Sequence, residues 1–179
     1  ADILESFAGF YRELYKARPL AEEHQIRAYL ADIEVPTLSV TGRQALEGDI
    51  MLQEVQEAIA HLKSAKSPGA NGLPNEFFKK YSDTLSPHLL NMFRDAQAEK
   101  SLPPDLRSAT IVTIYKAGKP RDRCDSYHPI SLLNTETKIL ASILAARMVR
   151  IISSLVHQDQ SGFMPGRSTR WNVCRAHNF

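Results

Sequence analysis

Four basic side chains gather in one short stretch of the sequence. Lys116, Lys119, Arg121 and Arg123 fall within eight residues, with a glycine and a proline between them. Lysine and arginine on such a loop are typical of a phosphate-binding site, because they supply positive charge and hydrogen-bond donors together. The stretch predicts contact with a polyanion, and a solvated basic face is the alternative.

The usual catalytic arrangements are not found in the sequence. There is no nucleophile elbow, metalloprotease, Walker A or dinucleotide-binding motif, and the six histidines show no metal-ligand spacing. Cys124 and Cys174 lie far apart, which favours two plain thiols over a disulfide framework or a zinc site. Asp122 and Asp125 flank arginines that would neutralise them. We predict no catalytic residue and no metal site here.

Length and composition indicate one soluble globular domain or a piece of something larger. The chain has 179 residues, of which 43% are hydrophobic and 23% charged. No apolar window is long enough for a transmembrane helix, and the N-terminus lacks the features of a signal peptide. We therefore expect an intracellular protein with no membrane contact. Both ends suggest a cut chain, so we expect a fragment.

The charge is unevenly distributed along the chain. Residues 1–60 hold 5 Lys and Arg against 11 Asp and Glu, whereas residues 61–179 hold 17 against 9. An acidic head followed by a basic body is common in chains that lay one face on a polyanion. The distribution favours nucleic acid as a partner.

Most of the elements that would position these groups are helices. Apolar periodicity predicts helices over 3–17, 21–31 and 52–63, with a loop from Val35 to Ile50 between the second and third. Two prolines and two glycines between Lys66 and Pro74 predict a loop. Further helices are expected over 75–81 and over 86–100, where Ser86 could cap and Pro87 suits the first helical position.

The basic stretch lies between two segments of strand character. Residues 109–115 are β-branched and aromatic, and 127–133 reads as a second extended segment, so a hairpin is predicted. The longest helix should run from Asn134 or Thr135 to about Val156 and carry a wide apolar stripe, part of it exposed. A loop over 161–167 then leads to a last helix near Ser168.

Four sequence segments follow one another in the order and at the spacing of a known pattern. They are Lys66-Ser-Pro-Gly-Ala-Asn-Gly72, then Lys116 after a strand, then Tyr127-His-Pro-Ile-Ser-Leu-Leu-Asn134, then Gln160-Ser-Gly-Phe-Met-Pro-Gly-Arg167. Lys138-Ile139-Leu140 and Arg147 follow on the long helix, and an aromatic helix with Phe7 and Tyr11 precedes. In these features the chain resembles reverse transcriptases of LINE-type non-LTR retrotransposons.

The resemblance covers nearly the whole chain and implies a fold and a domain plan. The implied fold is α+β and mostly helical, polymerase fingers-like, with one short antiparallel β-hairpin: an incomplete right-hand polymerase lacking the palm. Residues 1–60 would form a helical N-terminal extension, and residues 61–179 the fingers portion of a reverse transcriptase domain. The parent reaction is RNA-directed DNA synthesis, with an RNA template and a DNA primer as partners.

The resemblance also assigns roles to residues. Lys116 matches the lysine that faces the triphosphate, and His128 stands where the family has an arginine, so binding of a deoxynucleoside triphosphate should be weak or absent. Phe163 matches a residue near the templating base, with a buried loop anchor as the alternative. Glycines would let backbone N–H groups face the template. The expected nucleic-acid-binding residues are Lys66, Gly69, Gly72, Lys119, Arg121, Arg123, Gly162, Phe163 and Arg167.

Three other positions depart from the family pattern. Asn71 replaces an aspartate and Ala70 a proline in the first loop. Met51 stands where a threonine usually caps the third helix, so we expect the capping-box contact with Glu54 to be lost. We interpret these departures as drift in a copy that is no longer selected.

The palm aspartates that hold Mg²⁺ in the complete enzyme are missing, because the chain stops before the first of them. We therefore expect no cofactor in this fragment and no polymerase activity by itself. Primer extension by the purified chain, with Mg²⁺ and all four nucleotides, would contradict this.

Two other functions remain open from the residues alone. A non-enzymatic RNA- or DNA-binding module would use the basic face of residues 107–175, and a helical interaction scaffold would use the acidic head. A scaffold predicts no affinity for RNA. A His128→Arg change separates the first two functions, because only a remnant nucleotide site should gain triphosphate affinity from it.

Overall fold

The structure is a computed structural model that describes residues 2–17, 20–34 and 36–177. The chain forms two compact units. The small unit comprises Ala1–Val35 and Ile111–Ser131, and the large unit comprises Pro36–Thr110 and Leu132–Phe179. Each unit contains part of the predicted site, so each is described by itself.

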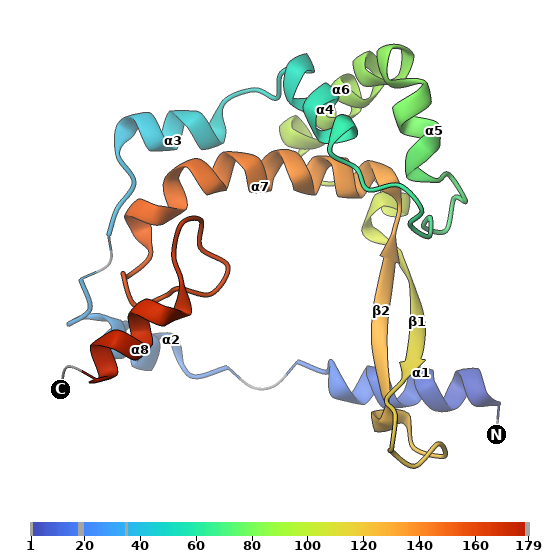
Figure 1. Ribbon diagram of the computed structural model, residues 1–179, viewed down its shortest axis with the longest axis horizontal. Coiled ribbons are helices and arrows are strands. Elements are labelled where there is room, and N and C mark those ends of the chain that lie inside the picture. Colours follow the sequence, from blue (N-terminus) through green and yellow to red (C-terminus); the bar gives the residue numbers. More distant parts are fainter. Residues whose placement is uncertain (1, 18–19, 35, 178–179) are drawn as a thin grey trace. The chain divides into compact units, whose positions relative to one another are not determined.

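The large unit consists of helices around one apolar core. Its long helix α7 runs along α3 and α4, and α4 packs in turn on α6 (Figure 1). Val55, Ile59, Phe93, Ile139 and Ile143 are almost completely buried, and they come from α4, α6 and α7. The helices of this unit are α3 (Val40–Glu47), α4 (Leu52–Ala60), α5 (Asn75–Lys80), α6 (Ser82–Glu99), the 3-10 turn η1 (Pro104–Arg107), α7 (Thr135–Leu155) and α8 (Thr169–His177).

The small unit packs a helix against a β-hairpin. It holds α1 (Ile3–Leu14), α2 (Glu23–Leu30), the 3-10 turn η2 (Cys124–Ser126) and most of the hairpin formed by β1 (Ala109–Tyr115) and β2 (Tyr127–Leu133). The ring of Phe7 meets the ring of Tyr127 edge-on, with centroids 5.2 Å apart. Tyr11 is buried on the same helix. Aromatic side chains at helical spacing therefore attach α1 to the hairpin.

The structure confirms the mostly helical α+β class and, within the described residues, the one β-hairpin. The bounds of α1, α2, α4, α5, α7 and α8 differ from the predicted bounds by at most three residues. The predicted loop between Val35 and Ile50 is wrong, because it contains α3. Ser39 caps this helix by accepting a hydrogen bond from the Gly42 N–H at 3.0 Å. Eight residues with a glycine inside give too weak a periodicity for sequence analysis to detect.

The predicted start of α6 at Ser86 is also wrong. The helix begins at Ser82, so Pro87 lies inside it rather than at its first position. Ser86 is fully buried, and its hydroxyl donates to the Ser82 carbonyl at 2.7 Å instead of capping the helix. A proline in the second turn removes only one backbone hydrogen bond, and Leu89 and Phe93 further along the helix are buried in the core and hold it there.

Arg147 of α7 ties α7 to the segment between α3 and α4. Its guanidinium bonds both carboxylate oxygens of Glu54, each at 2.7 Å, and donates to the carbonyls of Leu46, Gly48 and Asp49. Only 7% of the Arg147 side chain is exposed. Glu54 also accepts from the Met51 N–H at 2.9 Å, so the expected loss of its capping contact is wrong. The capping-box hydrogen bond that Glu54 accepts is therefore present, although Met51 replaces the usual threonine.

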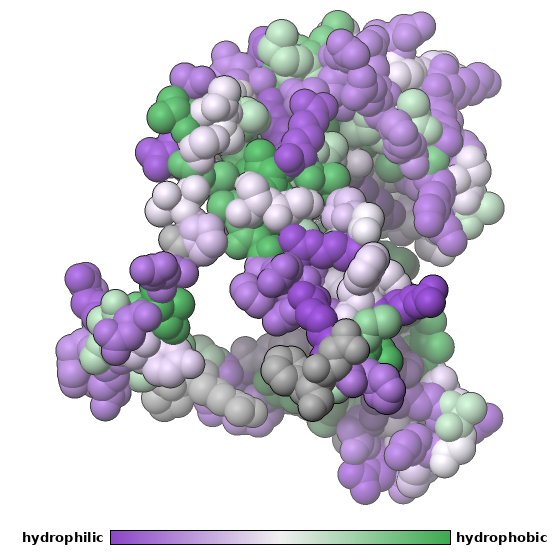
Figure 2. All heavy atoms as spheres, turned by 60° about the vertical axis from the view of Figure 1, so that its left-hand side comes forward, coloured by the Kyte–Doolittle hydropathy of each residue, from purple (hydrophilic) through white to green (hydrophobic). Residues whose placement is uncertain are grey.

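Part of the α7 apolar stripe is exposed, as predicted. Leu144 and Met148 of this stripe are each about half exposed. The upper part of Figure 2, which holds α3 to α7, shows an apolar (green) area among hydrophilic side chains. None of the helices described is long and apolar enough to cross a bilayer. The predicted domain boundary at residue 60 stays a prediction, although α4 on its N-terminal side packs on α6 and α7.

Candidate nucleic-acid interface

Lys116 lies where the ladder of the hairpin ends. Its N–H donates to the Ser126 carbonyl at 2.8 Å, and its ammonium Nζ donates to the Asp125 carbonyl at 2.9 Å. The side chain is half-buried. The hairpin thus fixes the charge of Lys116 near the base of the loop.

Two tyrosines organise the rest of the basic loop. The Arg121 guanidinium lies over the ring of Tyr115, 4.8 Å from its centroid, and the Tyr127 hydroxyl donates to the Arg121 carbonyl at 3.0 Å. The Tyr115 hydroxyl donates to the Lys119 carbonyl. Lys119 and Arg121 are exposed. Aromatic and backbone contacts therefore hold this loop in one shape while two cationic side chains face solvent.

Arg123 is paired within its own loop. Its guanidinium donates to both carboxylate oxygens of Asp125, at 3.0 and 2.7 Å. This hydrogen bonding lowers the pKa of the Asp125 carboxyl and raises the pKa of Arg123. The predicted neutralisation of Asp125 by an arginine is confirmed. Arg123 consequently adds less net positive charge to the loop than Lys119 or Arg121.

His128 shares a face of the hairpin with Lys116. The rings of Tyr115 and Tyr127 are in contact, with centroids 5.6 Å apart, on the face that α1 covers. Successive side chains of a strand alternate between its two faces. Lys116, which follows Tyr115, and His128, which follows Tyr127, therefore lie on the opposite face. His128 is exposed. The hairpin thus brings the two predicted nucleotide-binding residues to one surface.

The loop between Lys66 and Pro74 is attached to the first turn of α7. The Asn71 amide donates to both carboxylate oxygens of Glu136, at 3.0 and 3.1 Å, and the Asn71 N–H donates to Asn134 Oδ1. A side chain at Gly69 would place its Cβ in collision with the backbone and the side-chain Oδ1 of Asn134. The loop therefore needs a glycine at 69 for its own packing.

Gly72 and Lys66 complete the predicted residues of this loop. Gly72 has a φ of +73°, which favours glycine, and its N–H donates to the Gly69 carbonyl at 3.1 Å. That N–H is thus occupied inside the turn rather than directed at a template strand. Lys66 is exposed. Its predicted contact with nucleic acid stays a prediction.

Sequence analysis missed the buried polar residues that hold this loop in place. The Thr135 hydroxyl lies 3.1 Å from both the Leu73 carbonyl and Asn75 Oδ1, and the Asn75 amide donates to the Lys63 carbonyl at 2.7 Å. Both side chains are buried. Asn75 directly follows the glycine-rich loop, but Thr135 is the first residue of α7. Only contacts between residues 12 to 62 positions apart show what the two side chains do.

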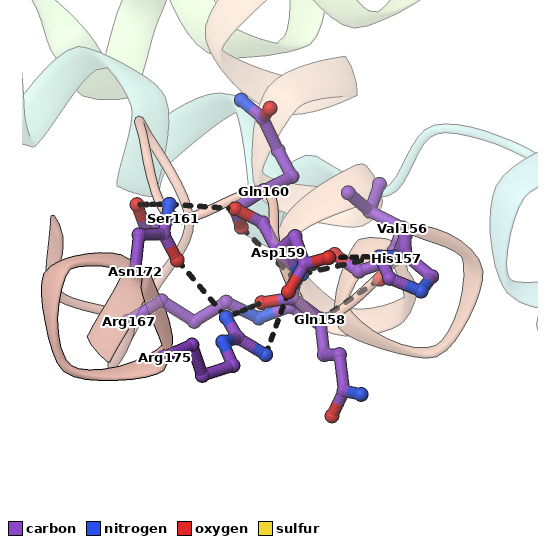
Figure 3. Close-up of polar contacts among 9 residues, drawn as sticks. All are labelled: Val156, His157, Gln158, Asp159, Gln160, Ser161, Arg167, Asn172 and Arg175. Atoms are coloured by element: carbon purple, nitrogen blue, oxygen red, sulfur yellow. Dashed lines mark hydrogen bonds and ion pairs between the residues drawn. The ribbon is translucent and has the colours of Figure 1, made fainter. Parts of the chain in front are cut away.

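The loop after α7 is held by Arg167, which Figure 3 shows beside Val156, His157 and Gln160. Its guanidinium donates to four carbonyls: those of His157 at 2.6 Å, Gln160 at 3.0 Å, and Ser153 and Val156 at 3.1 Å each. Arg167 was predicted to line the template path. Its contacts in this structure are all within the loop and the end of α7.

Phe163 lies at the tip of that loop. Its side chain is fully exposed and its φ is +61°, a conformation that non-glycine residues rarely adopt. The alternative of a buried loop anchor is therefore wrong. Gly162, next to it, is half-buried and has a negative or extended φ that requires no glycine.

The predicted site residues divide between the two units. Lys116, Lys119, Arg121, Arg123 and His128 belong to the small unit. The members in the large unit are Lys66, Gly69, Gly72, Gly162, Phe163 and Arg167. Within residues 2–17, 20–34 and 36–177, no three His, Cys, Asp or Glu side chains gather in a way that could hold a metal ion.

Comparison with known proteins places this geometry in context. No model of a protein family matches the chain. It is 31% identical over 165 residues, 92% of its length, to the uncharacterized 149 kDa protein of transposon TX1 from Xenopus laevis. It is 31% identical over 128 residues to a probable RNA-directed DNA polymerase from transposon BS of Drosophila melanogaster. A third relative, the RNA-directed DNA polymerase from mobile element jockey of Drosophila funebris, is 28% identical over 98% of the chain.

The matched region is a small part of each relative. It covers 12% of the TX1 protein, 14% of the transposon BS protein and 19% of the jockey polymerase. The chain therefore corresponds to a segment of much longer proteins.

Proposed function

Because this chain is related over most of its length to the RNA-directed DNA polymerases of LINE-type non-LTR retrotransposons, we propose that it is the segment of such an enzyme that holds the RNA template and faces the incoming nucleotide. Both ligands are polyanions. A segment with this role needs cationic side chains in fixed positions on its surface.

The observation that carries the proposal is the ordered basic loop of the hairpin. Lys119 and Arg121 are exposed, whereas the loop beneath them is fixed by contacts with Tyr115 and Tyr127. A cation on an ordered loop loses less conformational entropy when it binds phosphate than one on a flexible chain. This loop is the place where we expect the backbone of a nucleic acid to bind.

Lys116 and His128 are the proposed nucleotide-facing residues. They share the hairpin face opposite α1, so a triphosphate there could meet both side chains. A neutral imidazole offers one N–H donor where an arginine offers a planar fork, so we expect weak triphosphate affinity that a His128→Arg variant increases. A non-enzymatic nucleic-acid-binding module predicts no such gain.

RNA binding as a function of salt tests the proposal. A single-stranded RNA oligonucleotide is titrated with the purified chain at several salt concentrations, and the Lys119→Ala/Arg121→Ala variant is compared with an Arg43→Ala/Lys80→Ala control. The control removes the same charge from exposed positions outside the proposed site. Each phosphate contact on a single strand contributes about 0.7 to the slope of log affinity against log salt, so the hairpin variant should lower the slope by about 1.4.

The outcomes separate the candidate functions. A slope that falls for the hairpin variant and not for the control supports a polyanion site on this loop. Equal losses in both variants indicate non-specific charge attraction and contradict the proposal. No binding at low salt contradicts both nucleic-acid functions and leaves the interaction scaffold.

A further inference from the structure

The guanidinium of Arg167 has almost no capacity left for a ligand. An arginine side chain has five N–H donors, and four hydrogen bonds from Nη1 and Nη2 of Arg167 go to backbone carbonyls. Only the Nε–H donor is not committed by these bonds. A phosphate could be gripped by the usual planar fork only if several of these bonds were broken.

The acceptors show what Arg167 does instead. Two of them, Ser153 and Val156, belong to the C-terminal end of α7, where the last carbonyls of a helix have no partner inside the helix. A cation there also interacts favourably with the helix dipole. The other two acceptors, His157 and Gln160, lie in the loop that follows. One side chain thus closes the helix and fastens the loop to it.

The same loop is fastened to α8 by a second set of contacts (Figure 3). Asp159 forms an ion pair with Arg175 at 2.7 Å. The Asn172 amide donates to the Asp159 carbonyl at 2.8 Å and to the Ser161 hydroxyl at 3.0 Å. Residues 157–167 are therefore tied at one side to α7 and at the other to α8.

Phe163 is the residue whose position depends on this fastening. Its positive φ is unfavourable for a side chain with a Cβ and persists only where the surrounding contacts impose it. The ring is fully exposed, so no apolar packing of its own holds the residue in this conformation. The loop thus presents the ring outward at a cost, which the bonds of Arg167 help to meet.

We propose that Arg167 is a positioning residue: it locks the 157–167 loop to the end of α7 so that Phe163 is presented to the bound nucleic-acid strand, and it does not itself contact phosphate. This inference rests on the proposed function for its ligand. It reassigns Arg167 from the template-lining role expected from the sequence.

Three variants separate positioning from phosphate contact. Arg167→Lys keeps the charge but cannot span four carbonyls with one ammonium, whereas Arg167→Gln removes both. Arg170→Gln is the matched control, because Arg170 is an exposed arginine three residues away. A phosphate contact should be largely rescued by lysine, but a positioning role should not.

The first readout needs no RNA. Trp171 is the single tryptophan of the chain, and its side chain lines the same shallow cavity as Arg167, Ser161 and Gln158. We expect Arg167→Lys and Arg167→Gln to shift the Trp171 emission and to speed amide hydrogen exchange over 157–167, while circular dichroism and the Arg170→Gln control stay unchanged. Wild-type emission and exchange in Arg167→Lys would overturn the proposal.

The second readout is RNA affinity. We expect both Arg167 variants to lose about tenfold in RNA affinity, as much as Phe163→Ala loses, with the slope of log affinity against log salt unchanged. The Arg167→Lys/Phe163→Ala double variant should bind RNA no worse than Phe163→Ala alone. A slope that falls by about 0.7 in Arg167→Gln and recovers in Arg167→Lys would overturn the proposal in favour of a phosphate contact. If the wild-type chain binds no RNA, the proposed function and the role of Phe163 fail, whereas the Trp171 readout still decides whether Arg167 holds the loop.

Discussion

The side-chain amide of Asn71 is a hydrogen-bond donor to the carboxylate of Glu136. It donates to both oxygens of the Glu136 carboxylate, and its own carbonyl oxygen accepts the Leu73 N–H at 3.1 Å. We expect Asn71→Asp, which restores the residue of the resembled family, to destabilise the chain by about 1 kcal/mol, because it replaces a hydrogen bond to a charged group by the repulsion of two carboxylates. Urea denaturation at neutral pH measures the difference.

A second variant gives this prediction its control. In Asn71→Asp/Glu136→Gln a neutral amide again faces a carboxylate, with donor and acceptor exchanged, so most of the lost stability should return. If Asn71→Asp alone is as stable as the wild type, the contact with Glu136 contributes nothing. The contact also argues against drift as the reason for Asn71, because the residue fits its surroundings.

At the scale of the elements, one ion pair joins α7 to α4. Hydrogen bonds from Arg147 lower the pKa of the Glu54 carboxyl, so the folded chain binds a proton less readily there than the unfolded chain. The stabilisation from Glu54 is therefore present above the ordinary pKa of a glutamate and is lost as the pH falls through the lowered value. We expect the free energy of unfolding of the wild type to fall more steeply between pH 5 and pH 3 than that of Glu54→Gln.

Glu57→Gln is the control for this comparison, because it removes a carboxylate from the same helix that does not contact Arg147. Its pH dependence should follow the wild type more closely. Arg147→Met should cost about 3–5 kcal/mol at neutral pH, since it leaves Glu54 and the carbonyls of Leu46 and Gly48 without their partner. Parallel pH curves for Glu54→Gln and wild type would show that the ion pair adds no pH-dependent stability.

An element could be predicted from the sequence where local signals specify it, and could not where contacts with distant residues do. The helix α7 and the hairpin were predictable, because apolar periodicity and β-branched residues are local signals. The helix α3 was not, since it is short and packs on α7 about a hundred residues away. The basic loop was found from composition, but the hydrogen bonds of Arg167 and the close approach of Gly69 to Asn134 depend on partners that no local pattern specifies.

At the scale of the whole molecule, the two units have separate apolar contacts. The core of the large unit lies among α4, α6 and α7, whereas the small unit is held by aromatic contacts such as that between Phe7 and Tyr127. Larger cores resist opening more strongly. We therefore expect amide hydrogen exchange to be slowest in α4, α6 and α7, and faster in α1 and the hairpin.

One substitution in each unit tests whether the units open separately. Ile139→Ala, at a fully buried position of α7, should cost about 2–5 kcal/mol and speed exchange throughout α4, α6 and α7. Phe7→Ala should speed exchange in α1 and the hairpin alone, because its ring contacts are made there. If Ile139→Ala deprotects α1 and the hairpin by the same free energy as α7, the chain unfolds as one cooperative body instead. In that case a change in the large unit would also reach the basic loop, and the RNA affinity of Ile139→Ala would fall with its stability.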